Sequence, residues 1–256
     1  MDRILLASAT LFFAVNFLLM FTRMIRGLQR QTGLEMALAC AGFMLQSKVL
    51  WERGQLHGRC PITSACEVLL FLSWAVMLWY FLLGSTYRLS LLGVFSSGLV
   101  AALQAAALLP GIYSRVAVRA TGAVDPWLEL HASLSLLAYG AFGIASLAAL
   151  MFIFHDRQLK KRPPPRVFLH LPPITQLFRA MMLVLLLGCL LLAAGMAAGY
   201  FTHGNPSGAK HIVSYVVLAI YAVVVALRWK GSSHRRVAIG AVAGFVLAVL
   251  SLWVVS

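Results

Sequence analysis

Long apolar stretches, separated by short polar segments, run through the whole chain. A helix needs about 20 mostly apolar residues to cross a membrane. The stretches that meet this length are Ile4–Met24, Thr32–Trp51, Glu67–Gly84, Leu89–Leu109, Trp127–Phe154, Leu177–Thr202, His211–Leu227 and Val237–Val255. Their apolar positions are continuous rather than alternating, which favours helices over the strands of a barrel. The pattern predicts an all-α integral membrane protein with about eight transmembrane helices, in a single domain over residues 1–256.

The composition supports a membrane protein and excludes two other classes. Apolar residue types make up 61% of the chain and charged types 11%, and the mean hydropathy is +0.89. A soluble domain is about half apolar and about a quarter charged, and a disordered chain has little apolar surface to bury. The first stretch has neither the basic flank nor the cleavage site of a signal peptide, so we expect it to remain as a helix.

Basic residues are divided unequally between the two sides of the predicted bundle. The net charge of +14 would suggest a nucleic-acid partner in a soluble protein, but here the charges flank apolar helices. The loops after the first, third, fifth and seventh stretches carry 14 Lys and Arg residues, and the other side carries 7. The positive-inside rule makes the richer side cytoplasmic. We therefore expect a multi-pass protein of the bacterial inner membrane, surrounded by lipid, with both termini on the outer side and no nucleic-acid partner.

His131 is the polar residue that most needs an explanation. It lies just inside the fifth stretch, with Ser135 and Tyr139 on the same helical face. An ionisable group near the end of a membrane helix usually faces a bundle interior or a polar cavity. Two interpretations are open, a histidine hydrogen-bonded to a neighbouring helix or an axial ligand of a haem iron. His203 or His211 would lie on the same side and could supply a second ligand.

Other polar residues carry less information. His155, His170 and His234 fall among basic residues of the inner loops, so we expect them on the solvated surface. Glu35 and Lys48 lie inside the second stretch and are expected to snorkel towards the interface. The chain has no GxSxG, Walker A or HExxH motif, so we expect no catalytic activity of its own. Glycines in the apolar stretches are expected to serve close helix packing.

Two cysteines share the outer loop between the second and third stretches. Five residues separate Cys60 from Cys66, and an oxidising compartment permits a disulfide between them, although both could also stay reduced. The spacing is neither CxxC nor CxxCH, so a thioredoxin-like site and covalent haem attachment are not indicated. Glu67 begins the third stretch and is expected to pair with Arg53 or Arg59 across the same loop.

Three segments, taken together in their order and spacing, resemble a known family. They are Arg53-Gly54 with Gly58 to Glu67 and Phe71 to Trp74; Trp127 to His131 with Ser135, Ala138 and Tyr139; and Lys210 with Ile220 to Ala222 and Arg228. The resemblance is to the cytochrome c assembly protein family, which includes the haem-handling CcsA/ResC and CcmC types and smaller HemX and YpjD-like members. It extends over most of the chain from Thr32 onward.

The resemblance implies a bundle of about eight helices with an outward-facing haem site, in which His131 matches the first of two outer His ligands. The tryptophan-rich haem motif of the full haem handlers would fall in residues 203–209, which contain no Trp. The second outer His would follow Ser256. The two membrane His positions of the family are occupied by Gln46 and Ala226. These departures favour the smaller HemX-like branch.

The resemblance leads to two expected functions. The first is a haem-handling accessory protein of cytochrome c biogenesis or haem-pathway regulation, which binds or presents haem b near the outer leaflet, with His131 on the haem iron and basic groups at the propionates. The residues assigned to this site are His131, His211, His203, Tyr139, Arg53, Arg59 and Lys210. The second is a haem-free structural subunit that scaffolds a partner membrane protein, for example one of the ResB/CcsB type.

Overall fold

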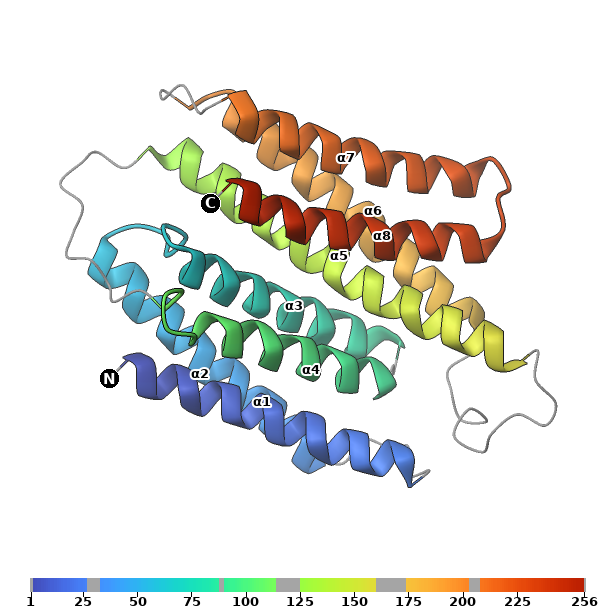
Figure 1. The fold of residues 1–256 in the computed structure, drawn as a ribbon, viewed down its shortest axis with the longest axis horizontal. Helices are drawn as coiled ribbons and strands as arrows, with labels where there is room; N and C mark the ends of the chain where they lie inside the picture. Colours follow the sequence, from blue (N-terminus) through green and yellow to red (C-terminus); the bar gives the residue numbers. More distant parts are fainter. Residues whose placement is uncertain are drawn as a thin grey trace. The chain divides into compact units, whose positions relative to one another are not determined.

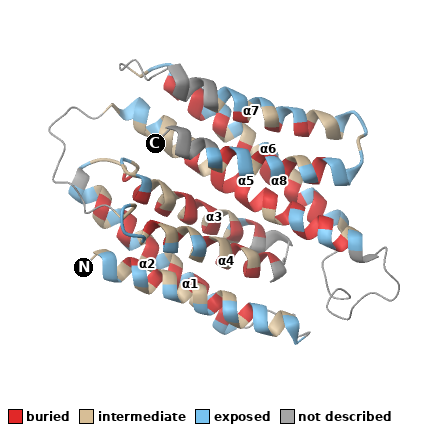
Figure 2. Cartoon of the chain, in the orientation of Figure 1, coloured by how far each residue is buried: buried red, intermediate tan, exposed pale blue. Residues whose placement is uncertain are grey.

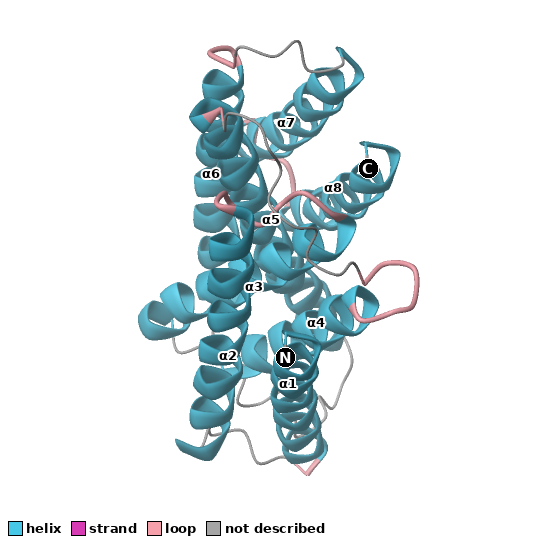
Figure 3. Cartoon of the chain, turned by 90° about the vertical axis from the view of Figure 1, so that its left-hand side faces the viewer, coloured by secondary structure: helices cyan, strands magenta, loops and turns pink. Residues whose placement is uncertain are grey.

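The computed structural model describes residues 2–26, 33–87, 90–113, 125–159, 174–202 and 208–255. The helices in these ranges are α1 (Asp2–Ile25), α2 (Gly33–His57), α3 (Ala65–Tyr87), α4 (Ser90–Ala107), α5 (Pro126–Leu159), α6 (Ile174–Gly199), α7 (Gly208–Trp229) and α8 (His234–Val255) (Figure 1). The described ranges contain no strand (Figure 3). The all-α prediction is therefore confirmed, with one helix for each apolar stretch.

The length and apolar character of several helices indicate a membrane protein. In the described ranges, α1, α5, α6 and the part of α3 up to Leu83 are long and apolar enough to cross a membrane. Shorter apolar segments lie in α4 and α7, at Leu92–Ala107 and Ser214–Trp229. The chain is a multi-pass membrane protein. Eight spans and outward-facing termini stay predictions.

The helices group into two compact units of four. Unit 1 contains α1 to α4, and α1 and α3 each contact both α2 and α4. Unit 2 contains α5 to α8, and its contacts follow the same order, with α5 and α7 each touching α6 and α8. Each unit is therefore a closed ring of helices in chain order, as in an up-and-down bundle.

Polar side chains join the helices of unit 1. Asn16 Nδ2 on α1 donates to Ser97 Oγ on α4 at 3.0 Å. Gln46 Nε2 on α2 donates to the carbonyl of Leu70 on α3 at 2.9 Å and to Ser73 Oγ. Such bonds hold membrane helices together where lipid offers no hydrophobic driving force. Gln46, at a His position of the resembled family, thus packs between two helices.

Glycines bring α5 and α6 of unit 2 into close contact. A Cβ at Gly188 would lie 2.6 Å from Cε1 of Phe142, and one at Gly195 would lie 3.2 Å from Cβ of Leu134. The Phe142 ring stacks on Tyr221 of α7 with 3.7 Å between centroids. Burial is continuous along the middle of α5 (Figure 2). The prediction that glycines serve helix packing is confirmed here.

Two surface predictions from the sequence are wrong. His155 is only 7% exposed, because α5 continues to Leu159 and keeps this residue on the helix. Glu35 does not snorkel; its side chain is 4% exposed and its Oε1 pairs with Nη1 of Arg23 at 3.1 Å. His234 is exposed, as expected, in the first turn of α8. His170 lies outside the described residues.

Candidate functional site

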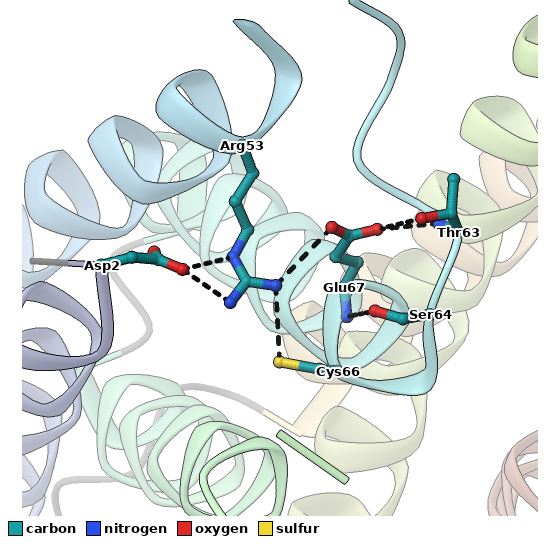
Figure 4. A network of polar contacts seen from close by, with 6 residues as sticks. All are labelled: Asp2, Arg53, Thr63, Ser64, Cys66 and Glu67. Atoms are coloured by element: carbon teal, nitrogen blue, oxygen red, sulfur yellow. Dashed lines mark hydrogen bonds and ion pairs between the residues drawn. The ribbon is translucent and has the colours of Figure 1, made fainter. Parts of the chain in front are cut away.

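A fully buried guanidinium joins three helices of unit 1 (Figure 4). Arg53 lies near the end of α2, and its side chain is 0% exposed. Its Nε and Nη2 both donate to Oδ2 of Asp2 on α1, at 2.9 Å and 2.7 Å. Its Nη1 lies 3.6 Å from Oε1 of Glu67 and 3.8 Å from Sγ of Cys66, both at the start of α3. The predicted pairing of Glu67 with Arg53 is confirmed.

The start of α3 holds Glu67 in place. Ser64 and Glu67 form the S-x-x-E pattern of a capping box, and the backbone N–H of Glu67 donates to Ser64 Oγ at 3.3 Å. Oε2 of Glu67 accepts hydrogen bonds from the backbone N–H and the hydroxyl of Thr63, at 2.9 Å and 2.8 Å. One carboxylate oxygen is thus fixed by its own loop, and the other faces Arg53 (Figure 4).

Arg53 is a permanent cation in this setting. Burial alone would lower the pKa of Arg53, but the hydrogen bond and charge of Asp2, with Cys66 and Glu67, hold it above its ordinary value. The guanidinium also lies 5.6 Å from the ring centroid of Tyr113, which Arg3 approaches to 5.2 Å. Burial and the charge of Asp2 raise the pKa of Tyr113, while Arg53 opposes the rise. Two cations therefore share one neutral aromatic ring.

The second cluster lies in unit 2, around His131 in the second turn of α5. Nδ1 of His131 is 2.7 Å from the carbonyl oxygen of Gly195 on α6. A carbonyl can only accept, so Nδ1 carries the proton in this bond. In the neutral ring the lone pair then lies on Nε2, and a backbone carbonyl on the other nitrogen is the usual support of a metal-ligating His.

Glycine backbone of α6 packs against this imidazole. A Cβ at Gly199 would lie 2.9 Å from Nδ1 of His131, so the backbone of α6 is in close contact with the imidazole ring. Two aromatic pairs lie near the adjoining helix ends, Trp127 with Phe201 and Tyr200 with Tyr215. The Trp127 and Phe201 centroids are 5.0 Å apart, and the Tyr200 and Tyr215 hydroxyls are 2.6 Å apart. All four are exposed.

Tyr139, a further predicted site residue, is not next to His131 on α5. Tyr139 lies eight residues farther along α5, about 12 Å at 1.5 Å per residue, and is buried with its ring centroid 6.3 Å from Phe142. His203 lies outside the described residues, as do the side chains of Lys210 and His211 on α7.

The outer loop of unit 1 holds the other predicted residues. Nε of Arg59 is buried and has no hydrogen-bond partner among the described residues, so Arg59 retains a donor for an incoming acceptor. Cys66 is buried and Cys60 partly buried, and their disulfide stays a prediction. Arg53 and His131 belong to different units, and each cluster is described by itself.

Sequence reasoning missed three residues that shape these clusters. Gly195 and Gly199 form a GxxxG pair, which is a readable signal for close helix approach, but nothing in it indicates that a His lies opposite. Asp2 carries no local signal at all, because its partner Arg53 is 51 positions away. Only the return of α2 along α1 brings the two together.

Comparison with known proteins agrees with the resemblance read from the sequence. A family model described as cytochrome C assembly protein matches residues 62–256. The protein NrfI of Wolinella succinogenes is 28% identical over 231 residues, which are 82% of this chain and 22% of that protein. The cytochrome c biogenesis protein CcsA of Microcystis aeruginosa is 30% identical over 49% of this chain and 38% of its own length. The protein HemX of Brevibacillus brevis is 24% identical over 85% of this chain and 82% of its own length. The chain thus spans well under half of the first two relatives.

Proposed function

This chain belongs to the cytochrome c assembly protein family, and from that premise we propose that it is a haem-handling accessory protein of cytochrome c biogenesis or haem-pathway regulation. It would bind or present haem b at the outer leaflet of a bacterial inner membrane. The relatives named for cytochrome c biogenesis and as HemX support this role by likeness. The single observation that carries it is the bond from Nδ1 of His131 to the carbonyl of Gly195.

The donor set around His131 fits a haem. The bond to Gly195 orients the ring and leaves Nε2 as the nitrogen that binds iron. Trp127 and Phe201 offer exposed apolar ring surface near the same helix ends, suited to a flat macrocycle. Haem, when bound, supplies an iron that accepts imidazole nitrogen and is tuned by that ligand. The protein's own part is to position the imidazole, exclude water and neutralise the propionates.

An absorption spectrum tests this proposal. The protein is purified in mild detergent and titrated with haem b, beside His131→Gly. We expect a Soret band in the parent protein that is weakened or shifted in His131→Gly and restored by free imidazole. Ser133→Ala is the matched control, because the Ser133 hydroxyl donates within its own helix, to the carbonyl of Glu129 at 2.7 Å. The proposal is overturned if the parent protein shows no Soret band, or if His131→Gly leaves that band unchanged.

One observation favours the second function, a haem-free subunit that holds a partner membrane protein of the ResB/CcsB type. Arg53, expected at a haem propionate, pairs instead with carboxylates of its own chain. Such a clamp serves an assembly role equally well. Purification with a stoichiometric membrane partner, and without haem, would support this function over the first.

A further inference from the structure

Arg53 is paired, but the pairing with Asp2 is incomplete. Both Nε and Nη2 of Arg53 point at one oxygen, Oδ2 of Asp2. A guanidinium fork matches both oxygens of a carboxylate. The second oxygen, Oδ1, is buried and has no hydrogen-bond partner among the described residues. Asp2 therefore binds the guanidinium through only one of its two carboxylate oxygens. A buried acceptor without a donor costs free energy.

The two carboxylates beside Arg53 differ in how firmly they are held. Glu67 is fixed by both Thr63 bonds and lies inside a capped helix. Asp2 is in the first turn of α1, where backbone N–H groups have no partner within the helix. Its side chain is 21% exposed, against 2% for Glu67. Asp2 is therefore the carboxylate that can leave, and its departure uncovers the fork of Arg53 on that side.

The surroundings favour another carboxylate in the place of Asp2. Without Asp2, Arg53 loses both charge-assisted bonds to Oδ2 and keeps the longer 3.6 Å contact to Glu67, so this buried cation loses much of its charge compensation. Arg3 lies beside the same Tyr113 ring, which adds a second positive charge at this end of unit 1. A neutral ligand would leave these positive charges uncompensated, whereas a carboxylate would restore the charge-assisted hydrogen bonds of Arg53.

We propose that the guanidinium fork of Arg53 is a carboxylate-binding site, which Asp2 keeps filled until a ligand carboxylate replaces it. The ligand class is a carboxylate-bearing tetrapyrrole, and this identification rests on the proposed function. The site itself requires neither iron nor His131. Asp2 acts as an internal competitor, and its removal strengthens ligand binding, whereas removal of Arg53 weakens it.

Metal-free protoporphyrin IX tests the site without any iron ligand. Its binding to the full chain in detergent is followed by porphyrin fluorescence, beside its dimethyl ester, which lacks both carboxylates. We expect Asp2→Asn to bind the free acid about tenfold more tightly, the change that about 1.4 kcal/mol produces. Arg53→Gln should bind it more weakly than the parent. The ester should bind all variants alike.

Matched variants and a second ligand sharpen the outcome. Glu52→Gln removes a carboxylate next to Arg53 in sequence, one that pairs with Lys48 at 3.8 Å, and should leave the affinity unchanged. Metal-free porphyrin has no iron for His131 to bind, so failure of the haem proposal is separate from failure of this one. Competition by succinate shows whether a small dicarboxylate suffices.

Two results overturn the proposal. One is equal affinity of the parent and Asp2→Asn for the free acid. The other is an ester that binds as tightly as the acid, which would mean apolar adsorption. If Arg53→Gln does not fold, as judged by circular dichroism and gel filtration, the Asp2→Asn and ester comparisons still decide the question.

Discussion

Unit 1 and unit 2 have the same arrangement of four helices, but prominent contacts in the two units differ in kind. In unit 1, side chains such as Asp2, Arg53 and Asn16 reach across to neighbouring helices through ion pairs and hydrogen bonds. In unit 2, Gly188 and Phe142 bring backbones and rings into direct contact. Polar contacts depend on both partners being present, whereas steric contacts depend on volume. The Arg53 ion pairs of unit 1 and the Gly188 contact of unit 2 should therefore respond to opposite kinds of substitution.

The largest effect is expected at the polar clamp of unit 1. Arg53→Leu leaves Glu67 buried without its cation and should lower the free energy of unfolding by about 3–5 kcal/mol. Unfolding in a denaturing detergent, followed by circular dichroism, measures it. Lys48→Leu, on the exposed side of the same helix, is the control and should change it by less than about 0.5 kcal/mol. Equal losses in the two variants would contradict the assignment of Arg53 as a clamp.

An intermediate effect is expected where one added methyl group tests the steric contacts of unit 2. Gly188→Ala places a Cβ 2.6 Å from the Phe142 ring and should lower the free energy of unfolding by about 1–3 kcal/mol through overpacking. Gly33→Ala at the start of α2 is the control, because its Cβ would meet nothing within 4 Å. A stabilising Gly188→Ala would mean that α5 and α6 have room to spare.

The smallest effect, and one of opposite sign, is expected from a buried hydroxyl of unit 2. Tyr221 is fully buried, and its Oη has no hydrogen-bond partner among the described residues. Tyr221→Phe keeps the ring stacked on Phe142 and removes this orphaned group. The same unfolding measurement should show no loss, or a gain of up to about 1 kcal/mol. A clear loss would show that the Tyr221 hydroxyl makes a stabilising polar contact.

The sequence predicted the helices well, because membrane helices are determined by local apolar length. It also predicted the pairing of Glu67 with Arg53, since both flank one loop. It could not find Asp2, whose role depends on how α1 and α2 fold back on each other. It misread His155, because a basic neighbourhood in sequence does not reveal where a helix ends. Contacts made within one loop were predictable, and contacts made between distant helices were not.

The length of α5 has a consequence for the environment of His131. Its 34 residues extend over about 51 Å at 1.5 Å per residue, whereas the hydrocarbon core of a bilayer is about 30 Å thick. The polar ends of the helix, with Glu129 and Arg157, can extend into the headgroup region, and tilt takes up any remaining hydrophobic mismatch. His131, in the second turn, then moves towards water in a thin bilayer and towards the acyl chains in a thick one. Acyl-chain length would thereby set the depth at which this imidazole meets a ligand.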